Sequence, residues 1–123
     1  MRKITKESIN AFLNEFTFNK QNMSVSVAFG RTHSATVNNH YEGNFNFTEL
    51  KLHGNTIAYK IGEDIFISNC GWESNTTKER LNSLINEYYG YPTSVDYGIY
   101  QKNFVWYLNE VEWDGKMTKL QNR

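Results

Sequence analysis

The sequence predicts an α+β fold in which an antiparallel sheet of about five to seven strands packs against two helices. Apolar residues recur at helical spacing in two segments, about 5–16 and 77–89, and alternate with polar residues in several others. Aromatic residues make up 15% of the chain, which favours a sheet-rich core because these rings pack well on pleated surfaces. The 123 residues suit a single domain over 1–123, and they contain no linker, low-complexity run or internal repeat.

The first helix is expected over about residues 5–16. Its apolar residues follow the i, i+3, i+4, i+7 spacing of one helix face, at Ile9, Phe12, Leu13 and Phe16. Thr5 is the expected N-cap residue, because its hydroxyl can accept a hydrogen bond from a free N–H group of the first turn.

Two strands are expected next, over about 22–29 and 34–38. In the first, apolar residues alternate with small ones and so indicate one buried face, formed by Met23, Val25, Val27 and Phe29. The second strand rests only on the alternation of Ala35 and Val37. A loop or an open hairpin end follows over about 38–43.

Residues 44–68 give the clearest strand signal in the chain, a three-stranded meander. Turn residues at 53–55 and 62–64 separate its strands. The apolar residues of the first strand change parity near Thr48–Glu49, which predicts a β-bulge or a break there.

The second helix, about 77–89, has the best-defined ends. Thr76 and Glu79 have the spacing of a capping box, while Gly90 and Pro92 are typical of a helix C-terminus. Its apolar face is formed by Leu81, Leu84, Ile85 and Tyr88.

The remaining residues predict further hairpins. One strand rests on the alternation of Val95, Tyr97 and Ile99, and the next on Phe104, Trp106 and Leu108. Turns are expected at Lys102-Asn103 and at Asn109-Glu110, and Met117 and Leu120 indicate a final edge strand.

Charge and composition exclude several functional classes. The 13 Lys and Arg residues balance 13 Asp and Glu residues, which excludes a basic nucleic-acid coat and an acidic mimic of DNA, but not a local patch of either sign. A single cysteine excludes an internal disulfide and a cysteine-clustered zinc site. No apolar run suggests a membrane span and no secretory signal is present, so we expect a cytoplasmic protein that does not engage a membrane.

Three segments resemble the pattern of a family of small accessory proteins of tailed bacteriophages. The central segment, 67–82, reads ISNCGWESNTTKERLN, and the upstream segment, 52–58, reads LHGNTIA. The downstream segment reads QKNFVWYLN at 101–109 and is followed by Trp113-Asp114-Gly115. This chain has Glu110 where the family pattern has a turn glycine, which leaves the type of that hairpin open.

The resemblance implies a role for the chain but no chemistry. It covers about 49–115 well and the first 16 residues loosely, whereas about 20–45 lie outside the pattern and read as an insertion. Small phage genes of this kind typically interfere with the host or its defences, as anti-CRISPR and other counter-defence proteins do. The implied site of action is the cytoplasm of the infected bacterial host.

The residues with catalytic potential do not form a recognisable constellation. His33, His40 and His53 lack the spacing of metal ligands, so we expect neither a metal site nor a cofactor. Cys70 precedes a helix N-terminus, which can lower a thiol pKa, and His53 is the nearest base in sequence. A small hydrolase is therefore kept as an alternative, but a buried structural thiol is the favoured interpretation of Cys70 and we expect no enzyme.

Candidate binding residues gather at the start of the second helix and just before it. The N-terminus of the second helix gathers hydroxyls, an amide and two cations that suit a phosphate or carboxylate, on Asn75, Thr76, Thr77, Lys78 and Arg80. The competing interpretation is that Thr76 caps the helix while Lys78 and Arg80 are solvated surface charges. Trp72 discriminates between further alternatives: buried, as we favour, it fixes the loop in the core, and exposed, it stacks on a base or anchors a protein partner.

The last hairpins provide a second candidate surface, with Lys102, Trp106 and Trp113 as contact residues. Because the strand at 104–108 is apolar on both faces, its outer face is either covered or available for protein contact or homodimerisation. The sequence thus predicts non-enzymatic binding to a host or defence protein, which the chain inhibits. The alternative is a nucleotide or short nucleic-acid binding module that uses Thr76–Arg80.

Overall fold

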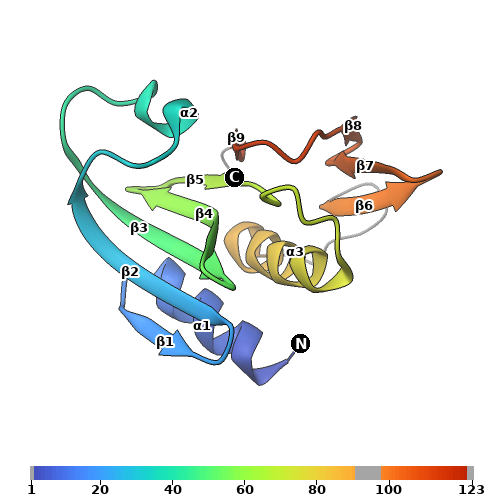
Figure 1. The fold of residues 1–123 in the computed structure, drawn as a ribbon, viewed down its shortest axis with the longest axis horizontal. Helices are drawn as coiled ribbons and strands as arrows, with labels where there is room; N and C mark the ends of the chain where they lie inside the picture. The colour runs from blue at the N-terminus through green and yellow to red at the C-terminus, as the bar shows by residue number, and fades with distance from the viewer. Residues whose placement is uncertain (1, 91–97, 122–123) are drawn as a thin grey trace.

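The computed structural model describes residues 2–90 and 98–121 and has an α+β fold, which confirms the predicted class (Figure 1). A six-stranded antiparallel sheet has the order β1-β2-β3-β4-β5-β9, and a second sheet has the order β6-β7-β8. The hairpins of the tail therefore form a sheet of their own instead of extending the first. Helices α1 and α3 contact each other, and their apolar faces enter one core with the larger sheet.

Helix α1, Lys3–Leu13, begins two residues before the expected start and ends three residues before the expected end. Thr5 is not its cap: it is buried, and its hydroxyl donates a hydrogen bond of 2.8 Å to Glu79 of α3. At the other end, Glu15 has a φ of +61°, which stops the helix. Phe16 consequently leaves the apolar face and is exposed, contrary to the sequence prediction.

The β1 (Phe18–Lys20) and β2 (Met23–Gly30) strands form a hairpin at one edge of the sheet. The prediction of a strand at 22–29 is confirmed, and β2 pairs with β3 along its whole length. Its expected buried face is only half correct: Met23 and Val25 are buried, whereas Val27 and Phe29 are exposed because the strand runs beyond the core there. The predicted strand at 34–38 is wrong, because α2 (Ala35–Asn38) is one helical turn. The hydroxyl of Ser34 accepts a hydrogen bond from Val37 N–H, a local bond that competes with strand pairing.

The meander is confirmed as β3 (Phe45–Leu52), β4 (Asn55–Ile61) and β5 (Asp64–Ile67). The register shift lies between Leu50 and Lys51, slightly beyond the expected place. The parity change at Thr48–Glu49 has another cause, because both faces of the sheet are covered there. Phe47 packs in a small cluster with Val37 of α2, whereas Leu50 belongs to the core with the two long helices.

Helix α3, Asn75–Tyr89, begins two residues earlier than expected. Ser74 is its N-cap, with a hydroxyl that accepts a hydrogen bond of 3.2 Å from Thr77 N–H, so the capping box proposed for Thr76 and Glu79 is wrong. Gly90 ends the helix with a φ of +81°, as expected from its position. The predictions for Pro92, Val95 and Tyr97 fall outside the described residues.

The tail contains β6 (Ile99–Lys102), β7 (Val105–Leu108), β8 (Val111–Glu112) and β9 (Thr118–Lys119). The first turn lies one residue later than predicted, at Asn103-Phe104, and the turn at Asn109-Glu110 is confirmed. Strand β9 pairs with β5 and confirms the expected edge strand.

Candidate binding site

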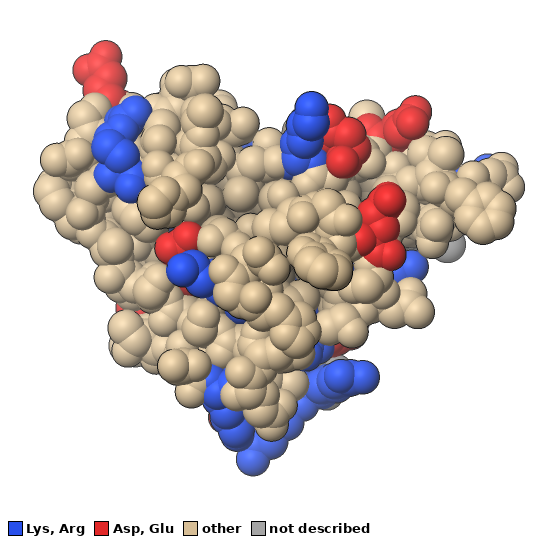
Figure 2. Space-filling model, in the orientation of Figure 1, with Lys and Arg blue, Asp and Glu red and all other residues tan. Residues whose placement is uncertain are grey.

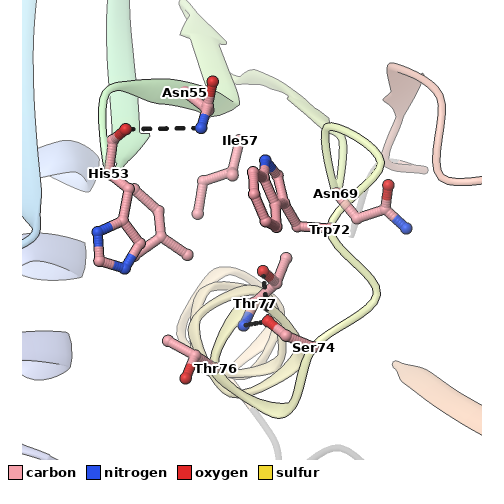
Figure 3. Close-up of a pocket in the computed structure, with 9 residues that line it drawn as sticks. His53, Asn55, Ile57, Asn69, Trp72, Ser74, Thr76 and Thr77 are labelled. Atoms are coloured by element: carbon pink, nitrogen blue, oxygen red, sulfur yellow. Dashed lines mark hydrogen bonds between the residues drawn. The ribbon is translucent and has the colours of Figure 1, made fainter.

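A pocket of about 230 Å³ opens between the β3–β4 turn, the loop that follows β5, and the first turn of α3 (Figure 3). Its lining comes from two segments that are separate in the chain. One side is formed by Leu52, His53, Asn55 and Ile57, and the other by Asn69, Trp72, Ser74, Thr76 and Thr77. These nine residues all lie in the segments LHGNTIA and ISNCGWESNTTKERLN, which therefore meet in space.

The loop from Ser68 to Glu73 is held in place by the Trp113-Asp114-Gly115 segment. The carbonyl oxygen of Gly115 accepts hydrogen bonds from the Ser68 hydroxyl at 2.9 Å and from the Asn69 N–H at 3.0 Å. A Cβ atom at position 115 would lie only 2.3 Å from the Asn69 side chain, so this close approach needs glycine. The Asn69 carbonyl in turn accepts a hydrogen bond from Trp72 N–H at 2.8 Å, which fixes the backbone that carries the indole.

The Trp72 side chain is exposed, with 62% of its surface accessible, so the favoured prediction of burial is wrong. Figure 3 shows its indole between Ile57 of β4 and the start of α3, with the His53 imidazole across the pocket. Cys70 and Gly71 have φ angles of +55° and +81°, and this tight turn directs the following residue outward. The hydrophobicity of the Trp72 indole favours burial, but the backbone turn at Cys70-Gly71 places it at the surface.

The two cations expected at the helix N-terminus do not line the pocket. Arg80 is only 1% exposed, and its guanidinium donates hydrogen bonds to Thr5 at 2.7 Å, to Glu79, and to Asn22 at 3.5 Å. The Lys78 ammonium lies 5.6 Å from the centre of the Trp106 ring, in a cation–π contact. Arg80 is thus not a solvated surface charge, and Lys78 is partly buried and directed toward Trp106 instead of the pocket.

The pocket lining is uncharged apart from the titratable His53. In the view of Figure 2, Lys and Arg side chains gather at the tip of the molecule near the N-terminus, and the centre of the face is largely free of charge. Asn75 is exposed but does not line the pocket, whereas Thr76 and Thr77 do. The arrangement offers an aromatic surface and neutral hydrogen-bonding groups.

The candidate contact residues of the tail differ in their burial. Trp106 and Trp113 are both buried in the core between the long helices and the sheets, so they are packing residues, whereas Lys102 is exposed on β6. The exposed aromatic of this hairpin is instead Phe104, with 93% of its surface accessible. It occupies the turn because the turn lies one residue later than predicted.

Cys70 lacks the features of an activated nucleophile. The residue is exposed, so the prediction of a buried thiol is wrong, and its Sγ lies 2.7 Å from the carbonyl oxygen of Thr56. Partial burial of the thiol raises its pKa, although a hydrogen bond with Ser68 lowers it in part. Within residues 2–90 and 98–121, no group of three His, Cys, Asp or Glu side chains could hold a metal ion.

Sequence reasoning named Trp72, Thr76 and Thr77 but missed six residues of the pocket lining, which are Leu52, His53, Asn55, Ile57, Asn69 and Ser74. The signal that could have found them is the pair of segments that carried the family resemblance, read together as two walls of one site. The cause of the omission is the sequence separation of these walls, which only the paired β3–β4 hairpin and α3 bring together.

The fold and the pocket define a small α+β protein with a pocket of about 230 Å³ whose lining carries no Lys, Arg, Asp or Glu. The chain belongs to the Kyanoviridae Gp96 protein family, whose model matches residues 1–121, and it is therefore a member of a bacteriophage protein family. No curated protein and no solved structure matches the chain. Among the residues that the structure describes, no helix is long and apolar enough to cross a membrane.

Proposed function

We propose that this phage protein acts by non-enzymatic binding to a host protein or an anti-phage defence protein in the cytoplasm of the infected cell, and that it inhibits this partner. The observation that carries the proposal is the exposed Trp72 indole at the rim of an uncharged pocket of about 230 Å³. Exposed tryptophans beside concave sites are typical anchors of protein interfaces.

The exposed indole can contribute much of the binding energy. An aromatic side chain buries about 150–250 Å² in full, so covering the 62% of Trp72 that is exposed removes roughly 90–155 Å² from water. At about 25 cal/mol per Å² this area corresponds to about 2–4 kcal/mol, the range of an interface hot spot. Around the indole, the side chains of His53, Asn55 and Thr76 can give hydrogen bonds that fix the orientation of a partner segment.

A nucleotide or short nucleic acid is the second candidate, and the same indole favours it as a surface for base stacking. The positions of Lys78 and Arg80 weaken this candidate, because their charges are already engaged with Trp106 and with Thr5, Glu79 and Asn22. Binding would then rest on the base and on helix N–H groups, with little dependence on salt.

The test is capture of partners from a bacterial host lysate with the tagged protein, read by mass spectrometry and by absorbance at 260 nm. The variant Trp72→Ala is compared with Phe104→Ala, a matched removal of an exposed aromatic side chain far along the chain from the pocket. We expect a stoichiometric protein partner whose affinity falls about 30-fold or more with Trp72→Ala and stays unchanged with Phe104→Ala.

Two results would overturn the proposal. The first is a protein partner that Trp72→Ala retains at full affinity. The second is a co-purified nucleotide, with no protein partner, that Trp72→Ala releases, which would establish the second candidate instead. Arg80 is left intact in these variants, because its removal would damage the core and confound the result.

A further inference from the structure

The outer edge of β2 has a strand beside it for only part of its length (Figure 1). Strand β1 pairs with Met23, Ser24 and Val25 and starts at Phe18, so no strand among the described residues lies on the outer side of the edge from Ser26 to Gly30. We call these five residues the free β2 edge. Its inner side pairs with β3 throughout, so the segment is held extended.

Hydrogen-bonding groups of two residues of this edge point outward. The carbonyl of Asn22 accepts a hydrogen bond of 2.8 Å from His53 N–H, so it faces the β3 side of the strand. Because the direction alternates along a strand, even-numbered residues of β2 face β3, and Val27 and Phe29 direct their N–H and C=O groups outward. In the part of the chain that the structure describes, no hydrogen bond satisfies these outward groups.

The free β2 edge lacks the usual protection against pairing. Natural edge strands carry charged residues, proline or a bulge, and the sequence Ser-Val-Ala-Phe-Gly at 26–30 has none of them. It also presents apolar surface on one face, where the side chains of Val27 and Phe29 are 46% and 67% exposed. An extended, unprotected and apolar edge is suited to the addition of another strand.

We propose that the free β2 edge pairs with the same edge of a second copy of this chain, antiparallel and around a two-fold axis at Ala28. In this register Val27 lies opposite Phe29 of the second copy, and Ser26 lies opposite its Gly30. Val27 and Phe29 are the residues with outward groups, so the two facing pairs form four main-chain hydrogen bonds. Their side chains also meet on the same face.

A second copy fits this edge better than an unrelated strand because the segment is complementary to itself. Each outward group and each apolar side chain finds its counterpart across the axis. Val27 and Phe29 contribute at most a few hundred Å² of apolar surface per dimer, which is below the roughly 1,000 Å² of a stable interface. The dimer is therefore reversible and dependent on concentration.

The first measurement is sedimentation equilibrium from about 10 μM to about 1 mM, which spans the expected weak affinity. The wild type is expected to shift from its mass of 14.4 kDa toward twice that value. The double variant Val27→Lys/Phe29→Lys is expected to stay monomeric, because it places like charges across the axis. The matched control Phe104→Lys makes the same change at an exposed turn and is expected to dimerise as the wild type does.

A cross-linking measurement tests the register itself, in a Cys70→Ser background because Cys70 is an exposed free thiol. Ala28→Cys places two thiols at the axis, where Cα atoms of a non-hydrogen-bonded pair are about 4.5 Å apart, so a disulfide-linked dimer is expected on mild oxidation. Ser26→Cys shares the face but lies two residues from the axis, about 13 Å from its counterpart, and is expected to stay uncross-linked.

Three outcomes would overturn the inference. The first is a wild type that remains monomeric up to about 1 mM. This result would overturn the inference even if a strand of another protein were found to pair with the edge. The second is a dimer that persists unchanged in the Val27→Lys/Phe29→Lys variant, and the third is cross-linking through Ser26→Cys in place of Ala28→Cys. Circular dichroism melting of each variant confirms that it is folded.

Discussion

The contact between Gly115 and Asn69 allows a quantitative prediction about the loop that carries Trp72. In Gly115→Ala, the new Cβ would lie 2.3–2.5 Å from atoms of the buried Asn69 side chain, at a φ of +82°. The left-handed backbone costs about 1–2 kcal/mol for an alanine, and overpacking costs about 1–3 kcal/mol more. We therefore expect the free energy of unfolding to fall by about 2–5 kcal/mol.

The matched control is Gly71→Ala in the same loop. Its φ of +81° is nearly identical, but a Cβ there meets nothing within 4 Å. The control should lose only the backbone share, about 1–2 kcal/mol, and the difference between the two variants isolates the clash with Asn69. Urea unfolding followed by circular dichroism measures both values. Equal losses in the two variants would refute the reasoning that Gly115 is needed for close packing against Asn69.

Three further predictions concern other parts of the molecule. Arg80→Ala should lower the free energy of unfolding by about 3–5 kcal/mol, because it leaves Glu79 without its buried partner. The control Lys78→Ala should lower it by about 1 kcal/mol or less, and similar urea midpoints for the two variants would contradict the buried role of Arg80. Glu110→Gly should raise stability by about 1 kcal/mol, since residue 110 has a φ of +72°, and an unchanged or lower melting temperature would argue against backbone strain in this turn. Burial and the hydrogen bond to Asp64 raise the pKa of Tyr41, so the unfolded chain loses this proton first and the free energy of unfolding should fall as pH rises above 10. Urea unfolding should show a smaller fall for Tyr41→Phe than for the wild type between pH 9 and pH 11, about the range around the ordinary tyrosine pKa. An identical fall in the two proteins would contradict the assignment to Tyr41.

The parts of the fold that the sequence predicted well are those with strong local signals. The meander at 44–68 combines alternating apolar residues with turn residues at both bends. Both signals depend only on residues that are neighbours in the sequence. The C-terminus of α3 was equally clear, because Gly90 is suited to the left-handed conformation that ends the helix.

The errors arose where distant contacts or backbone geometry decide the structure. Burial of Arg80 depends on Thr5, which lies 75 residues away in the sequence. The residues around Arg80, near the start of a helix, do not indicate this contact. The exposure of Trp72 follows from the turn at Cys70-Gly71 rather than from its hydrophobicity. The α2 turn was mistaken for a strand because two alternating residues are a weak signal, and the cap by Ser34 outweighed it.

The candidate site was predicted only in part for the same reason. Trp72, Thr76 and Thr77 belong to one segment and were identified together, whereas His53 and Asn55 come from a separate turn. The loop also depends on Gly115, which is distant in sequence from both walls. Pairing of the β3–β4 hairpin with the surrounding sheet sets the distance between the walls, and this distance has no local signature.

Oxidative footprinting of the three tryptophans, read by mass spectrometry with and without the captured partner, tests the central claim most directly. We expect Trp72 to be oxidised readily in the free protein and protected in the complex, while the buried Trp106 and Trp113 react slowly in both states. A free protein in which Trp72 resists oxidation would contradict the exposed indole. A complex in which Trp72 is oxidised as fast as in the free protein would contradict its role as the binding site.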